Sequence, residues 1–196
     1  MSFTQPTTAD PELANGYRVS DYRRDVDAKH REAIADAVYR RFQERYVSPI
    51  LAPSTHGFTK MAVACLMVEA LESFRRGWSD TSKRGQSEHA FCSFFDGHQQ
   101  FAPLRGHARD FYRGVRCGIL HQAETTLGWR IRRDTPTLLD QAGRVRTINA
   151  TQFVEALQAV LDHYRDELKA AAWDDELWTC LRYKMNAVCK NCDGAL

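Results

Sequence analysis

Residues 57–76, with the sequence GFTKMAVACLMVEALESFRR, decide the fold because they form one long segment that is apolar on most sides. The segment contains no proline, and Gly77 follows it at the position where a glycine commonly ends a helix. A helix that is apolar on most of its surface has to be covered by neighbouring elements. We therefore predict a central helix over residues 57–76 that the rest of the chain surrounds.

Further helices are predicted on both sides of this segment. Upstream, apolar residues recur every four positions from Ile34 to Tyr46, which indicates a helix from about Val26 that ends at Pro49. Downstream, apolar periodicity predicts helices over residues 87–97, 107–122, 149–168 and about 174–190, with Asn149 as the N-cap of the third. Residues 1–20 have little periodicity and are predicted to be a flexible arm, with 21–196 as one helical domain.

One stretch, residues 127–148, has the period of a strand. Its segments from Trp129 to Arg132 and from Arg144 to Ile148 alternate apolar with polar residues, and Gly143 lies between them. This pattern predicts a β-hairpin inserted before the last two helices. The predicted fold class is therefore mainly α, a helical bundle with a small β-hairpin and additional C-terminal helices.

Composition limits the classes of function. The chain has 196 residues, of which 43% are hydrophobic and 27% charged, enough for one domain with a core. Its net charge of +2 does not show the simplest signature of a nucleic-acid-binding protein, a strongly basic domain. No apolar run approaches the roughly 20 residues that span a bilayer, and no signal-peptide pattern is evident. We expect a cytoplasmic protein without a membrane partner.

Positive charge is concentrated in one part of the chain. Residues 104–146 contain nine arginines, no lysine and four acidic residues, a net charge of +5. Arginine suits bidentate recognition of phosphate. We predict that the substrate is bound by Trp129, through stacking on an unpaired base, and by arginines, namely Arg105, Arg109, Arg130, Arg132 and Arg133. A solvated face of the hairpin is the alternative interpretation.

The segment FYRGVRCGILHQ, residues 111–122, carries the chemistry. It places Arg113, Arg116 and His121 on one helix or at its end. A histidine can exchange a proton near neutral pH, and an arginine can stabilise the charge that builds on a phosphate. Together they suffice for phosphodiester cleavage without a metal: the histidine acts on the ribose 2′-hydroxyl or on the leaving 5′-oxygen.

The six residues from Arg116 to His121 resemble the Arg-x(4 to 6)-His signature of HEPN domains (higher eukaryotes and prokaryotes nucleotide-binding), and the resemblance covers about residues 25–125. It implies a HEPN-like helical bundle. Many HEPN domains are metal-independent ribonucleases that act as dimers, with Arg116 and His121 in the active positions here. Other members have lost catalysis and only bind nucleotides or partner proteins. Cys117 departs from the polar residue, often Asn, that follows the arginine in active members.

Helix geometry separates the two motif residues. At 100° per residue, Arg116 and His121 lie about 140° apart and about 7.5 Å along the axis. A site that uses both therefore requires a helix that ends or kinks near Gly118, or a second copy of the motif. His121 shares a face with Gly114 and Gly118, which suits a close helix contact either across a dimer or within one chain.

Two further features have open interpretations. Glu69 could support the site by holding Arg113 or Arg116, or it could lie at the edge of the buried surface and reach water, which we favour. Three cysteines, Cys180, Cys189 and Cys192, supply at most part of a zinc site, and simple thiols or a terminal disulfide fit them better. No cofactor or metal is expected.

The sequence thus predicts a homodimeric, metal-independent endoribonuclease, a toxin or a defence effector, whose partners are RNA or a nucleotide and an antitoxin protein. The alternative is a non-catalytic HEPN-like module that binds a nucleotide or a protein. A third interpretation is a helical scaffold whose arginine-rich hairpin binds an acidic partner.

Overall fold

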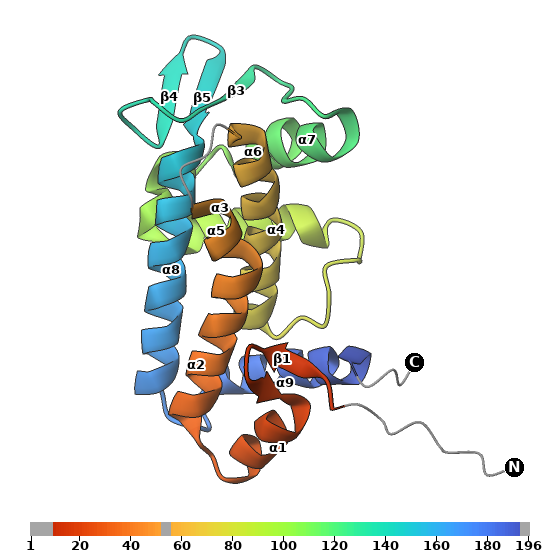
Figure 1. Cartoon of the computed structure of the whole chain (residues 1–196). Helices are drawn as coiled ribbons and strands as arrows, with labels where there is room; N and C mark the ends of the chain where they lie inside the picture. The colour runs from red at the N-terminus through yellow and green to blue at the C-terminus, as the bar shows by residue number, and fades with distance from the viewer. Residues whose placement is uncertain (1–9, 52–55, 193–196) are drawn as a thin grey trace, which may run out of the picture.

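The computed structural model describes residues 10–51 and 56–192, and it confirms a mainly α-helical chain (Figure 1). The helices are α1 (Val19–Asp27), α2 (Arg31–Phe42), α3 (Ser48–Leu51), α4 (Gly57–Arg76), α5 (Gln86–Gly97), α6 (Ala108–Phe111), α7 (Cys117–Gln122), α8 (Ala150–Ala170) and α9 (Glu176–Cys192). A 3-10 helix, Gln99–Leu104, follows α5, and π-helical turns, Gln43–Val47 and Tyr112–Arg116, join α2 to α3 and α6 to α7. No helix of these residues is long and apolar enough to cross a membrane.

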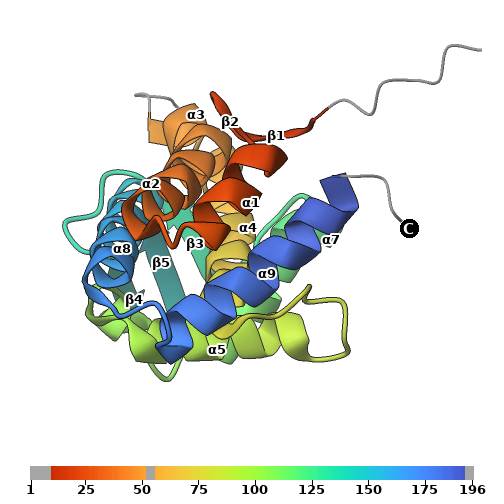
Figure 2. The ribbon, with the colours of Figure 1, turned by 90° about the horizontal axis from the view of Figure 1, so that it is seen from below.

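Helix α4 is the centre of the bundle, as predicted, and its bounds are those expected. It lies among α2, α5 and α8, while α9 crosses one end of the bundle (Figures 1 and 2). Gly77 ends α4 with a φ of +66°, and a Cβ there would come within 2.9 Å of the Cys180 backbone on α9. Only a glycine allows both this backbone turn and this approach of the two helices.

The start of the chain differs from the prediction. Strands β1 (Glu12–Ala14) and β2 (Tyr17–Arg18) pair antiparallel, and they bury Leu13 and Tyr17 in the core. The prediction of a flexible arm is therefore wrong for residues 12–20, and residues 1–9 lie outside the described part. The burial of two large apolar side chains fixes this segment onto the bundle.

Pro49 does not end the second helix, contrary to the prediction. It lies inside α3, which continues from α2 through the π-helical turn Gln43–Val47. A proline ring clashes with the carbonyl four residues earlier, which here is that of Arg45 in the widened turn. The turn therefore makes room for the proline, and the chain stays helical to Leu51.

The predicted hairpin is a three-stranded sheet. Strands β3 (Trp129–Arg132), β4 (Leu139–Ala142) and β5 (Val145–Asn149) have the order β3-β5-β4. The two predicted strands pair with each other, but in parallel, with Trp129 opposite Arg146. The hairpin is formed by β4 and β5 around Gly143. β4 lies between the two predicted strands in the sequence and is antiparallel to β5. The chain therefore reverses its direction twice between β3 and β5, so these two strands run parallel.

The last two helices are as predicted. The Asn149 side chain accepts hydrogen bonds from the Thr151 and Gln152 backbone amides and so caps α8. Phenylalanines from several elements meet in the core between α8 and the motif helix, and the rings of Phe111 and Phe153 stack with centroids 5.5 Å apart. This packing fixes α6, the first part of the motif helix, a name we use for α6, the π-helical turn and α7 together (residues 108–122).

Candidate functional site

The motif segment is helical, as predicted, but not uniformly so. Residues 112–116 form a π-helical turn between α6 and α7, and residues 117–122 return to α-helix. The Gly114 carbonyl accepts a hydrogen bond from the Thr126 amide at 2.8 Å, so the following loop closes onto this turn. Widened turns of this kind occur frequently at functional sites.

Arg116 is fixed by an ion pair with α4. Its Nε donates to Glu69 Oε1 at 2.8 Å, and only 18% and 11% of the two side chains are exposed. The hydroxyls of Thr81 and Ser87 also donate to this carboxylate. The favoured interpretation of Glu69 as an edge residue that reaches water is therefore wrong. Instead, Glu69 holds Arg116, the other possibility that the sequence left open.

The environment of Arg116 keeps it charged. Burial opposes the charge, but Glu69 outweighs this effect and raises the pKa of the guanidinium. The guanidinium carbon also lies 5.5 Å from the centroid of the Tyr112 ring, and burial raises the pKa of Tyr112. Tyr112 is not among the residues predicted for the site, although it lies one turn before Arg116. Thr81 and Ser87 are not predicted for the site either.

A narrow apolar groove adjoins Arg116. Its volume is about 70 Å³, and it is lined by α4 and α7, namely by Ala62, Cys65, Leu66, Arg116, Ile119 and Leu120. Leu66 and Leu120, at the edge of the groove, are 51% and 57% exposed. Burial raises the pKa of the Cys65 thiol, which therefore stays protonated at neutral pH. Cys117, the residue after the arginine, is partly buried.

His121 does not line this groove. It is exposed on the last turn of α7, one residue before the helix ends. Because residues 117–122 are regular α-helix, the expected angle of about 140° between Arg116 and His121 applies. The helix neither ends nor kinks at Gly118. One chain therefore does not bring the two motif residues together.

The glycines of the motif serve contacts within the chain. A Cβ at Gly114 would lie 2.4 Å from Cδ1 of Trp129, and one at Gly118 would lie 2.5 Å from the Glu124 carbonyl oxygen. The loop between α7 and β3 thus occupies the space beside both glycines. The structure thus shows that Gly114 and Gly118 allow a close contact within one chain, which is one of the two interpretations of these glycines.

Trp129 is not a stacking surface for a base, contrary to the prediction. It is 3% exposed, and its ring meets Phe111 edge-on with centroids 5.4 Å apart. Arg146, which the sequence analysis did not single out, covers its other side, with the guanidinium carbon 5.3 Å from the ring centroid, and pairs with Asp110 at 3.0 Å. Trp129 therefore anchors the sheet to the motif helix.

The arginines expected to bind substrate are exposed but divided between two places. Arg109 and Arg113 extend from the motif helix and share Glu88, each at 3.5 Å, and Arg105 donates to Gln99. Arg130, Arg132 and Arg133 are exposed on or beside β3, where Arg132 binds Asp134 and lowers the pKa of that carboxyl to about 2. Neighbouring acids therefore reduce the positive field that the composition suggested.

The cysteines do not form a metal site within residues 10–51 and 56–192. No group of three or more histidine, cysteine or acidic residues in this part could hold a metal ion. Cys180, Cys189 and Cys192 lie along α9, and Cys189 is buried. Their spacing follows the packing of that helix against the bundle.

Comparison with known proteins identifies no related protein. The chain matches no family model, no curated protein and no solved structure. Evidence for a function therefore comes from the residues from Arg116 to His121 and from the geometry around them.

Proposed function

We propose that the protein is a HEPN-like, metal-independent endoribonuclease that acts as a homodimer. The observation that carries the proposal is the fixed position of Arg116, which Glu69 holds on the wall of the groove between α4 and α7. The exposed Leu66 and Leu120 beside it provide an apolar surface for a second copy. His121 of that copy would then complete the site.

In the proposed mechanism, Arg116 binds the scissile phosphate and stabilises the charge that develops on its oxygens. His121 removes the proton of the ribose 2′-hydroxyl or donates a proton to the leaving 5′-oxygen. Arg113, which is 63% exposed, assists by contacting the same phosphate. The products would be a 2′,3′-cyclic phosphate and a 5′-hydroxyl, and no metal or cofactor would be required.

Such an activity fits a toxin or a defence effector that acts in the cytoplasm and is restrained by an antitoxin. The experiment is RNA cleavage by the purified protein in EDTA, with wild type compared with His121→Ala. We expect the variant to lose activity about 100-fold or more. His163→Ala, which removes an exposed histidine of α8, is the control and should cleave like wild type. Equal cleavage by wild type and His121→Ala would refute the assignment.

A complementation experiment tests the dimeric site. Arg116→Gln and His121→Ala would each be inactive alone, but a mixed dimer holds one complete site when the two residues come from different copies. Random mixing should restore about one quarter of the wild-type rate, because about half of the dimers are mixed and each has one of two sites intact. No recovery on mixing, with dimers present by ultracentrifugation, would show that each site uses a single chain.

The non-catalytic module is the second candidate, and one observation favours it. Glu69 already neutralises Arg116, and Cys117 occupies the position where active HEPN members often have Asn. This candidate predicts a stable dimer that leaves RNA intact and whose melting temperature rises when a nucleotide is added. Cleavage in EDTA that depends on His121 decides against it.

A further inference from the structure

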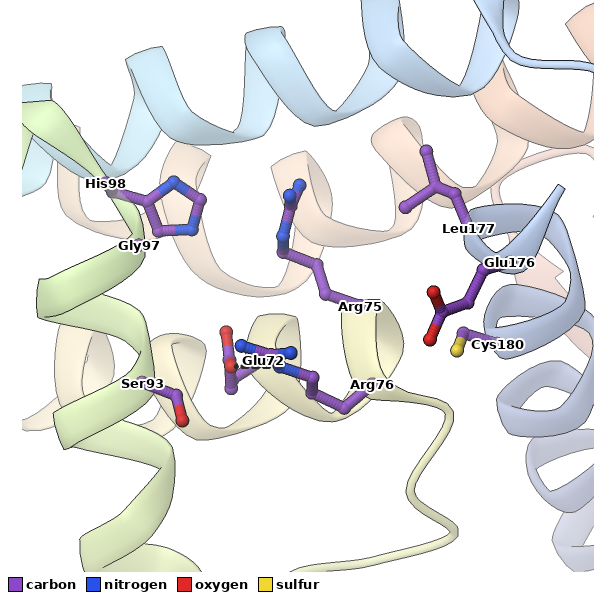
Figure 3. Close-up of a pocket in the computed structure, with 9 residues that line it drawn as sticks. All are labelled: Glu72, Arg75, Arg76, Ser93, Gly97, His98, Glu176, Leu177 and Cys180. Carbon is purple, nitrogen blue, oxygen red and sulfur yellow. Dashed lines mark hydrogen bonds and ion pairs between the residues drawn. The ribbon is translucent and has the colours of Figure 1, made fainter.

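A pocket of about 300 Å³ lies at the end of the bundle away from the sheet, where α4 and α5 end and α9 begins (Figure 3). Its volume is at the lower end of the range of roughly 300–1,000 Å³ for small-molecule sites. None of its residues lines the groove beside Arg116. The pocket is therefore a separate site, independent of the proposed ribonuclease activity.

His98 is the unusual residue of this pocket. It is 6% exposed, and its ring contacts Phe94 with centroids 4.6 Å apart. Its ring nitrogens make no hydrogen bond to the described residues, although a neutral imidazole has one donor and one acceptor. A buried polar side chain without a protein partner usually has a water or a ligand as its partner. The ring nitrogens of His98 are therefore available to a water or a ligand in the pocket.

The charge state of His98 follows from its surroundings. Burial, and after it the charge of Arg75 on α4, lower the pKa of His98 to about 4. Glu167 on α8 opposes this effect, while His163 on α8 and Arg76 on α4 add to it. His98 is therefore neutral at pH 7 and offers one N–H donor.

Arg75 and Arg76, from the end of α4, supply further hydrogen-bond donors to the pocket. Arg75 Nη1 donates to Glu167 at 2.6 Å, and Arg76 Nε donates to Glu72 at 2.9 Å. A guanidinium has five N–H donors in a fixed arrangement, so each arginine keeps donors for a ligand after this one bond. Figure 3 shows both arginine side chains and the His98 ring at the same pocket.

The acidic residues limit how strongly an anion binds. Glu176 lies at the start of α9, is exposed, and forms no ion pair within the described residues. Together with the two arginines and their two carboxylate partners, it gives the pocket a net charge of −1. Attraction for an anion therefore comes from individual N–H donors and not from net charge, and we expect a dissociation constant of about 1 mM.

We propose that this pocket binds a small oxyanion, a phosphate or carboxylate group that accepts hydrogen bonds from Arg75, Arg76 and His98. Arg75, Arg76 and His98 all keep N–H donors without a protein partner, and an oxyanion accepts hydrogen bonds from such donors. The size of the pocket leaves space for a larger molecule attached to that group.

The test is a titration of the wild-type protein, followed by NMR on the imidazole signals. Inorganic phosphate and acetate are added separately up to about 50 mM, well above the expected dissociation constant, against sodium chloride at equal ionic strength. We expect phosphate, acetate or both to move the His98 signal and to raise its pKa by about one unit, because a bound anion favours the charged imidazole. The signal of His30, which is exposed beside Asp25, is the control.

Two variants separate the proposal from its alternatives. Arg75→Gln should weaken binding about tenfold, because it removes donors and a charge. Glu176→Gln should strengthen binding, because it removes the unpaired acid. A His98 signal that responds to neither anion overturns the proposal. Weaker binding in Glu176→Gln also overturns it, because the carboxylate would then contact a cationic ligand. Neither variant alters Arg116 or His121, so these outcomes do not depend on RNA cleavage.

Discussion

The protonation of His98 makes a quantitative prediction for stability. In the unfolded chain a histidine titrates near pH 6.5, whereas burial lowers the pKa of His98 to about 4 in the folded protein. Between these values the unfolded state binds more protons, so the free energy of unfolding rises with pH. The contribution of His98 is complete above about pH 6.5 and is lost as the pH falls toward 4. At pH 5 the loss is about 2 kcal/mol.

The measurement is urea unfolding at pH 7 and pH 5 for wild type and His98→Gln, whose amide does not titrate. The loss between the two pH values should be about 2 kcal/mol larger in wild type, or roughly 4–8 °C in melting temperature for a domain of this size. The buffer should contain neither phosphate nor carboxylate, because a bound oxyanion would raise the pKa of His98. His121→Gln, at an exposed site of α7 away from His98, should behave like wild type.

Comparison with His98→Gln removes the contribution of the carboxyl groups, which titrate in both proteins. A difference between the two proteins below about 0.5 kcal/mol would refute the reasoning, because His98 would then bind its proton equally well folded and unfolded. A loss larger in the variant than in wild type would contradict even the sign of the effect.

Two further predictions concern the motif helix and are measured by urea unfolding. Gly114→Ala should cost about 1–3 kcal/mol, because the new Cβ would lie 2.4 Å from the indole ring packed there, whereas Gly97→Ala, in open space, should change stability by less than about 1 kcal/mol. Equal effects would mean that the loop does not pack on the helix. Glu69→Gln should cost about 1–3 kcal/mol because it leaves the half-buried Arg116 without its anion, whereas Glu88→Gln, whose partners are exposed, should cost less than about 1 kcal/mol.

Elements whose signal is local could be predicted from the sequence. The bounds of α4 follow from a continuous apolar segment and the glycine that ends it, and the cap of α8 follows from Asn149. Both signals act within a few residues along the chain. Tertiary packing reinforces these local preferences and does not compete with them, so the prediction and the structure agree.

Features that depend on distant contacts could not be predicted. Alternation identifies β3 and β5 as strands but does not contain the direction of their pairing, which depends on where β4 turns. Trp129 and Arg130 are neighbours in the sequence, yet one is buried and the other exposed, and only packing against the motif helix selects which. The widened turn that admits Pro49 likewise has no signal in the residues themselves.

The candidate site depends both on local signals in the sequence and on contacts between distant residues. Spacing alone gives the angle between Arg116 and His121, because residues 117–122 are regular helix, but the partner of Arg116 lies 47 residues away on α4. Glu69 fixes Arg116 on the wall of the groove, whereas α7 places His121 on a face that points away from the groove. The regular helix over residues 117–122 thus keeps the two side chains on different faces. In the proposed enzyme, association of two copies and assembly of the catalytic site are therefore one event.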